Sequence, residues 1–228
     1  VTWMVFVNSN KRSAKVDFPW SICAIMQKLR IFFIFNSYLF KKQTSFLLFG
    51  RKDTQKEQDF KDYNKFIADN SLLKEYIDKN FATKADRSGR VITGLSMGGH
   101  GGMWLSIRHQ DIFGGGGSMS GGLDIRPFPD SWNMKARLGE YASNKEVWDN
   151  HTVINQLDRL KDGSLAIIID CGADDFFLQV NKAAHEALLK RGIGHDFIIR
   201  PGAHNPRYWN NAIDYQVLFF KKFFNKSK

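Results

Sequence analysis

The pentapeptide Gly94-Leu95-Ser96-Met97-Gly98 matches the pattern G-x-S-x-G and lies between a strand-like run and a helix-like run. Residues 90–93 suit a short buried strand, and 98–109 carries apolar side chains at helical spacing. Flanking glycines let the backbone turn sharply from strand to helix, which holds a serine hydroxyl above the sheet. The sequence therefore predicts a nucleophile elbow with Ser96 at its tip.

Ser96 needs a general base, because a serine hydroxyl attacks poorly at neutral pH unless a histidine accepts its proton and an acid orients that histidine. His204 lies in a loop, after a predicted strand at 197–200 and Gly202. The other five histidines have simpler explanations as residues of helices and connections: His100, His109, His151, His185 and His195. We therefore predict that His204 is the base.

The acid has four candidates. The apolar run 165–172 predicts a strand whose end carries Asp170, and the turn after it carries Asp174 and Asp175. Acids at the carboxyl ends of parallel strands lie where ligands bind. Asp124, which follows the preceding predicted strand, is the fourth candidate. Local sequence leaves all four open.

Four segments, in this order, resemble the Putative esterase family, which includes S-formylglutathione hydrolases, tributyrin-type esterases, and feruloyl and acetylxylan esterases. They are ITGLSMGGHG (92–101), GSMSGG (117–122), DCGADDFF (170–177) and PGAH (201–204) with YW at 208–209. The resemblance extends from about Tyr76 to the C-terminus. It implies an α/β hydrolase, a mostly parallel sheet flanked by helices, with the N-terminal strands divergent or missing.

The resemblance also implies roles for individual residues. Ser96 would be the nucleophile, His204 the base and Asp175 the acid of an acyl-transfer mechanism. The backbone N–H of Met97 would be one donor to the oxyanion of the tetrahedral intermediate. Three side chains beside the acid and the base are candidates for an acyl pocket: Phe176, Tyr208 and Trp209.

Residues 1–60 are atypical for such a protein. Between Val1 and Ser88 the only glycine is Gly50 and there is no histidine, so the His-Gly turn expected to supply the second oxyanion donor is not found. The first fifty residues hold seven Lys or Arg against Asp17, and so carry six of the ten net positive charges. We interpret residues 1–60 as a divergent, truncated or mispredicted part of one domain spanning 1–228.

Two other interpretations of this segment are weaker. A basic stretch at 26–30 followed by an apolar run at 31–40 is similar to a membrane or export signal. However, it is internal, lacks a small-residue cleavage site and is too short to span a bilayer. The basic residues come with no nucleic-acid motif. We expect no stable membrane insertion and no nucleic-acid partner, and the sequence does not distinguish a cytoplasmic from a secreted protein.

The remaining features point to ordinary packing. Helices are predicted at 60–81, 176–191 and 209–224, and Gly114 to Gly117 suits a tightly packed strand rather than a phosphate loop. Cys23 and Cys171 form no disulfide framework, although one bond between them is allowed. Histidines and acids show no metal-ligand spacing, so we expect no metal and no cofactor.

The expected function is that of a serine carboxylesterase. Its partner would be a small-molecule ester, with a small acyl or aryl group, or an ester-decorated carbohydrate. An acyltransferase would use the same triad with another acceptor. A catalytically impaired remnant of the fold, acting in binding or structure, is the alternative from a different class. A missing early strand would leave the edge of the Ser96 strand unpaired, which favours a homo-oligomer.

Overall fold

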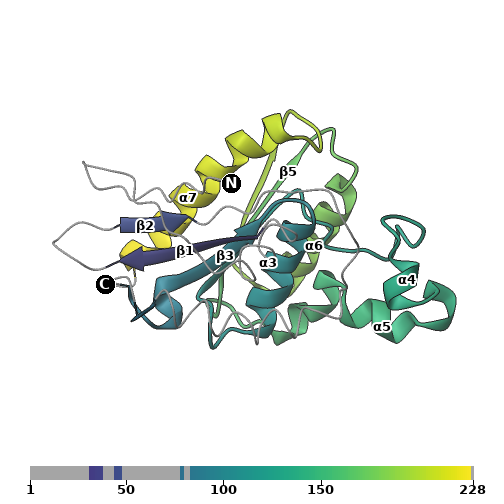
Figure 1. Ribbon diagram of the computed structural model, residues 1–228, viewed down its shortest axis with the longest axis horizontal. Coiled ribbons are helices and arrows are strands. Elements are labelled where there is room, and N and C mark those ends of the chain that lie inside the picture. Colours follow the sequence, from purple (N-terminus) through teal and green to yellow (C-terminus); the bar gives the residue numbers. More distant parts are fainter. Residues whose placement is uncertain (1–30, 38–43, 48–77, 80–82, 227–228) are drawn as a thin grey trace.

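The computed structural model describes residues 31–37, 44–47, 78–79 and 83–226. Much of 1–77 lies outside these residues, so the single domain 1–228 stays a prediction. The described residues form a six-stranded sheet in the order β2-β1-β3-β4-β5-β6 (Figure 1). The strands β3 to β6 are parallel, and β1 and β2 are antiparallel to their neighbours. The strands are β1 (Ile31–Ser37), β2 (Thr44–Leu47), β3 (Arg90–Gly94), β4 (Gly115–Met119), β5 (Ala166–Gly172) and β6 (Asp196–Arg200).

Helices cover both faces of the parallel strands (Figure 1). The alternation of β4 shows this directly: a side chain at Gly116 would meet Ser106 of α3, whereas side chains at Gly115 and Gly117 would meet Phe220 and Gln216 of α7. The helices after β3, β5 and β6 are α3 (Met97–Arg108), α6 (Leu178–Lys190) and α7 (Pro206–Lys226). This is the α/β architecture that the sequence predicts.

A long connection between β4 and β5 carries short helices that extend away from the sheet (Figure 1). They are α4 (Lys135–Leu138), η2 (Tyr141–Ser143), α5 (Lys145–Asn150) and η3 (Val153–Arg159); another short helix, η1 (Arg87–Gly89), precedes β3. The connection has a small core of its own, made of Ile125, Met134, Leu138 and Trp148. The Trp148 indole N–H also donates to the Gly139 carbonyl at 3.0 Å.

The start of α7 is set by a local cap. Asn205 accepts a hydrogen bond from the Tyr208 N–H at 3.1 Å, and Pro206 occupies the first helical position. Asn before a helix and Pro at its first position are a favoured combination. The helix therefore begins three residues before the predicted Trp209. Its apolar face packs Phe220 and Phe224 against strand residues Val91 and Ile168.

The predicted strands at 90–93, 165–172 and 197–200, and the helix at 176–191, are confirmed with shifts of one or two residues at their ends. Gly114 to Gly117 enters a buried strand, as predicted. The predicted helix at 60–81 lies almost wholly outside the described residues, of which Asp78 and Lys79 are helical. Among the described residues, no helix is long and apolar enough to cross a membrane.

A strand from the N-terminal part of the chain pairs with the Ser96 strand. Residues 31–37, part of the run considered as an export signal, form β1, because short runs of Phe and Ile suit a strand. β1 pairs with β3, so the edge of the Ser96 strand is not unpaired, and the argument for a homo-oligomer from that edge is wrong. The oligomeric state itself stays a prediction.

The close packing of α3 on β4 predicts an effect of Gly116→Ala. The new Cβ would lie 2.0 Å from the Ser106 Oγ and 2.7 Å from its Cβ. We expect the free energy of unfolding to fall by about 1–3 kcal/mol, measured by urea denaturation. In a Ser106→Gly background, which removes both atoms, the same change should cost clearly less. An equal cost in the two backgrounds would contradict this packing.

A second stability effect comes from His100, which is buried in α3 and donates from Nδ1 to the Gly122 carbonyl at 2.8 Å. Burial lowers the pKa of His100 from 6.5 to about 4. Between these values the unfolded chain binds more protons than the folded one, so stability is lost as pH falls from about 6.5 to about 4.

His100→Asn tests this, because the Asn amide can still donate to Gly122 but does not titrate. Between pH 7 and pH 4.5, we expect the native protein to lose on the order of 1–3 kcal/mol more unfolding free energy than the variant. Urea denaturation at each pH measures both. Parallel pH profiles would show that His100 is not the responsible group.

Candidate active site

Ser96 lies at the turn from β3 into α3, at the carboxyl end of its strand. Its backbone has φ 56° and ψ −120°, in a region that residues other than glycine rarely adopt. Two hydrogen bonds hold the turn: the Ser96 N–H donates to the Met119 carbonyl at 2.9 Å, and the His100 N–H donates to the Ser96 carbonyl at 3.0 Å. A strained backbone conformation persists only where the surrounding structure holds it in place, and such conformations are concentrated at functional sites. This is the geometry that the G-x-S-x-G pattern predicts.

The glycine at 99 lets α3 approach the end of β4. A Cβ at Gly99 would lie 2.7 Å from the Ser118 Oγ and 3.1 Å from the Gly121 Cα. The helix therefore begins close against the neighbouring strand. This close approach fixes where Ser96 stands above the sheet edge.

His204 and Asp175 meet Ser96 at the carboxyl ends of the parallel strands. The imidazole comes from the loop after β6, and its Nε2 lies 2.9 Å from the Ser96 Oγ. The Nδ1 lies 2.9 Å and 3.1 Å from the two carboxylate oxygens of Asp175, in the turn after β5. The His204 side chain is 15% exposed, and that of Asp175 is fully buried. A serine, a histidine and an acid thus form a continuous chain of hydrogen bonds.

The Asp175 carboxylate is kept ionised by its hydrogen bonds. Burial alone raises its pKa, but the hydrogen bonds from His204 and the Phe177 N–H, together with the nearby Ser120 hydroxyl, outweigh burial and hold the pKa below its ordinary value. The Phe177 N–H donates to Oδ1 at 2.8 Å. A charged acid beside Nδ1 orients the imidazole and stabilises its protonated form.

The other three candidate acids lie elsewhere. Asp170 is buried beside Arg200, at 2.6 Å, and the Tyr208 hydroxyl donates to its second oxygen. Burial raises the pKa of Asp170 despite these partners. Asp174 is exposed, and Asp124 pairs with Arg126 at 2.7 Å. Among the four, the structure brings Asp175 to His204.

The remaining histidines occupy the structural positions expected of them. His100 is buried against Gly122, and His109 ends α3. His151 stacks on Trp104 with ring centroids 6.1 Å apart. His185 and His195 face each other, with Nδ1 and Nε2 2.7 Å apart.

Of the three candidates for an acyl pocket, two lie beside the His204 ring and one does not. Phe176 is 52% exposed, with its ring centroid 4.4 Å from that of His204. Trp209 is buried and packs its edge on His204 at 4.9 Å. Tyr208 turns toward Asp170 and packs in the core with Met119 and Ala212, so the structure does not bring its hydroxyl to the base.

Two residues beside the site were not predicted from the sequence, although Ser120 lies in the family-like segment 117–122. The Ser120 hydroxyl is fully buried and makes no hydrogen bond of ordinary geometry among the described residues. It nevertheless lies close enough to Asp175 to help lower that pKa. Trp132, from the connection between β4 and β5, stacks on Phe176 at 6.0 Å. Only the fold brings these residues to the site, because each is far in sequence from the residue it meets.

The two expected oxyanion donors are the Met97 N–H and an N–H from a loop after an early strand. Met97 is the first residue of α3, where backbone N–H groups have no partner within the helix and the helix dipole favours negative charge. The loop expected to supply the second donor follows an early strand. However, β1 runs antiparallel to β3 and pairs Ile31 with Gly94 and Phe35 with Arg90. The end of β1 therefore lies beside the start of β3, away from Ser96. The beginning of β1 lies on the side of Ser96.

Cys171 is a free, buried thiol beside this network, and burial raises its pKa. Cys23 lies outside the described residues, so a bond between the two is not part of the described structure. Within the described part of the chain, no group of three or more His, Cys, Asp or Glu side chains is placed to hold a metal ion.

Comparisons with known proteins find esterases among the chains similar to this one. The chain is 27% identical over 176 residues to an acetyl esterase of Caldicellulosiruptor saccharolyticus, covering 71% of this chain and 63% of that protein. It is 29% identical over 106 residues to an S-formylglutathione hydrolase of Arabidopsis thaliana, covering 46% of this chain and 36% of that protein. The chain thus spans less than two thirds of either relative.

A solved structure of a ferulic acid esterase superposes with a TM-score of 0.61 at 28% identity, over 77% of this chain and 68% of that one. A sequence profile of the Putative esterase family matches residues 47–220, more than half of the chain. The match includes the elbow, the acid turn and the loop of the base. The chain belongs to the Putative esterase family and has the α/β-hydrolase fold.

Proposed function

We propose that this protein is a serine carboxylesterase that hydrolyses small acyl or aryl esters through an acyl-enzyme. The observation that carries the proposal is the contact of 2.9 Å between the Ser96 Oγ and the His204 Nε2, with Asp175 on the far side of the imidazole. Nucleophile, base and orienting acid within hydrogen-bond reach of one another are the signature of acyl transfer.

In the first half of the reaction, the Ser96 Oγ forms a bond to the ester carbonyl carbon while its proton passes to the His204 Nε2. The tetrahedral intermediate then breaks its bond to the leaving oxygen or sulfur, which takes the proton from Nε2. Asp175 stabilises the imidazolium that exists between these two transfers. The product is an alcohol or thiol and an acyl group on Ser96.

In the second half, water attacks the acyl carbon and gives its proton to Nε2. The bond to the Ser96 Oγ breaks, Oγ recovers the proton, and a carboxylic acid leaves. The Met97 N–H would stabilise the oxyanion in both halves. Removing one oxyanion donor typically lowers turnover by about 10²- to 10³-fold. Because the end of β1 lies away from Ser96, the loop after β1 is not expected to supply a second oxyanion donor. The lack of that donor would lower the rate but would leave the type of reaction unchanged.

The named relatives support the substrate class. They are described as an acetyl esterase, an S-formylglutathione hydrolase and a ferulic acid esterase. A xylanase/feruloyl esterase of Xylanibacter ruminicola matches over a shorter segment. By analogy we propose a small or aromatic acyl group on a small alcohol or thiol, or on a carbohydrate. An acyltransferase would use the same first half, with another acceptor in place of water.

Replacement of Ser96 tests the proposal. We expect Ser96→Ala to lower the rate of p-nitrophenyl acetate hydrolysis about 10⁴-fold or more, because the acyl-enzyme cannot form. Release of p-nitrophenol measures the rate, and Ser143→Ala, at an exposed serine, serves as the control. Equal rates for the native protein and Ser96→Ala would reject this proposal, and equal rates no faster than the reaction without protein would favour a non-catalytic remnant of the fold.

The adjacent acids give a matched pair for the role of Asp175. Asp175→Asn should lower kcat about 10⁴-fold, because an amide no longer holds the imidazole in its working tautomer. Asp174→Asn removes the same charge one residue away, at an exposed position. We expect that variant to stay within a few-fold of the native rate. If the two variants behaved alike, Asp175 would not be the orienting acid.

A further inference from the structure

Two exposed aromatic rings lie side by side next to the base. Trp132 is 48% exposed and Phe176 is 52% exposed, and their rings stack with centroids 6.0 Å apart and planes 29° apart. We call this pair the aromatic platform. Covering such rings from water is favourable, in proportion to the apolar area removed. Adjacent exposed aromatic side chains beside a reactive group are typical of a ligand surface.

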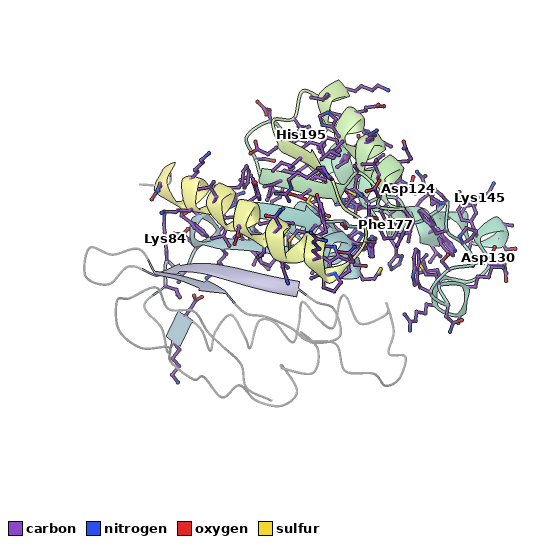
Figure 2. All side chains as sticks on the ribbon, turned by 90° about the horizontal axis from the view of Figure 1, so that it is seen from above. Lys84, Asp124, Asp130, Lys145, Phe177 and His195 are labelled. Atoms are coloured by element: carbon purple, nitrogen blue, oxygen red, sulfur yellow. The ribbon has the colours of Figure 1, made fainter. Side chains whose placement is uncertain are left out.

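The aromatic platform packs on the half-buried ring of Phe128 and the buried ring of Phe177. Trp132 packs on Phe128 at 5.7 Å and on Phe177 at 5.4 Å, and Phe176 packs on Phe177 at 4.5 Å. Phe177 is 2% exposed, and Figure 2 shows it where the connection between β4 and β5 meets the rest of the molecule, with Asp130 farther out on that connection. A surface held rigid before binding loses little entropy on binding.

The backbone adds to this rigidity. Trp132 and Asn133 have φ values of 53° and 54°, in the left-handed region that bulky residues rarely adopt. The packing of the Trp132 ring against Phe128 and Phe177 offsets that strain. Trp132 is therefore held against Phe128 and Phe177 while 48% of it stays exposed.

The position of the platform selects one side of the ester. The leaving oxygen must come within hydrogen-bond reach of the His204 Nε2 to take its proton. Phe176 lies against the ring of His204, with centroids 4.4 Å apart, and Trp132 continues from Phe176 away from the base. The alcohol portion of the substrate, which begins at the leaving oxygen, would thus extend over the platform, and Phe176 would then lie on the alcohol side rather than in the acyl pocket that the resemblance implies.

The openness of the platform favours a sugar over an aryl ring. A sugar ring has an apolar face of C–H groups and a rim of hydroxyls, so it can cover an exposed aromatic face while its hydroxyls stay in water. An aryl group has two apolar faces and gains most in an enclosed slot. Both platform rings are about half exposed, which suits contact on a single face.

We propose that Trp132 and Phe176 form a stacking surface for a sugar ring in the alcohol portion of the ester, which directs the enzyme toward acylated carbohydrates. The proposal rests on the esterase function above. It assigns alcohol-side specificity to Trp132, a residue outside the triad.

The test keeps the acyl group constant and varies the alcohol. For acetylated xylo-oligosaccharides and ethyl acetate, the ratio of the two kcat/KM values is measured in the native protein, Trp132→Ala and Trp132→Phe. We expect Trp132→Ala to lower this ratio about 10-fold, mainly through KM of the oligosaccharide, and Trp132→Phe to retain most of it. Leu189→Ala, at an exposed apolar residue of α6, should leave the ratio unchanged.

Two results would overturn the proposal. An unchanged ratio in Trp132→Ala would mean that the platform makes no contact with the sugar. A larger loss on phenyl acetate than on the oligosaccharide would mean that the platform takes an aryl ring instead. Phe176→Ala is a second variant in case Trp132→Ala alters the thermal unfolding of the protein.

A binding measurement separates this proposal from the esterase function. Calorimetric titration of acetylated xylo-oligosaccharide into Ser96→Ala requires no turnover. We expect the Trp132→Ala change to weaken that binding about 10-fold. If the native protein hydrolysed no ester but this binding difference held, the platform would stand and the esterase proposal would fail. Hydrolysis without any binding difference would support the esterase function and overturn the role of the platform.

Discussion

The structure depends on the strained turn at Ser96, where the chain passes from β3 into α3 with φ at 56°. The turn survives because α3 is packed so closely on β4 that Gly99 and Gly116 have no room for a side chain. Hydrogen bonds to Met119 and from His100 hold the backbone on both sides of Ser96. The packing of α3 on β4 thereby offsets the strain of the Ser96 backbone, which holds the hydroxyl at the carboxyl end of β3.

Parallel strands explain why the partners of Ser96 arrive at the same edge. The turns after β5 and β6 open on the side where β3 ends, so Asp175 and His204 meet Ser96 although they are far away in sequence. The antiparallel direction of β1 has the opposite effect, since its end lies away from Ser96. The same rule of strand direction thus brings Ser96, Asp175 and His204 together and places the end of β1 away from Ser96.

Much of this could be predicted from sequence, because apolar periodicity and glycine flanks are local properties. The strand before Ser96, the helix after it and the loop of His204 were all predictable in this way. The choice of Asp175 over Asp170 rested on resemblance, since neighbouring acids differ only in where their side chains point after the turn. Asn205 caps α7 and so places its start before the predicted Trp209, and the apolar run at 31–37 forms a strand.

By itself, the sequence determined the elbow, the order of the serine, the candidate acids and the histidine along the chain, and the alternation of strands and helices. These depend on backbone preferences and spacing within a few residues. Tertiary structure decided which carboxylate meets His204, the direction of β1 and the stacking of Trp132 on Phe176. Each of these joins segments that are distant along the chain, and their relative placement follows from packing, which no local pattern encodes.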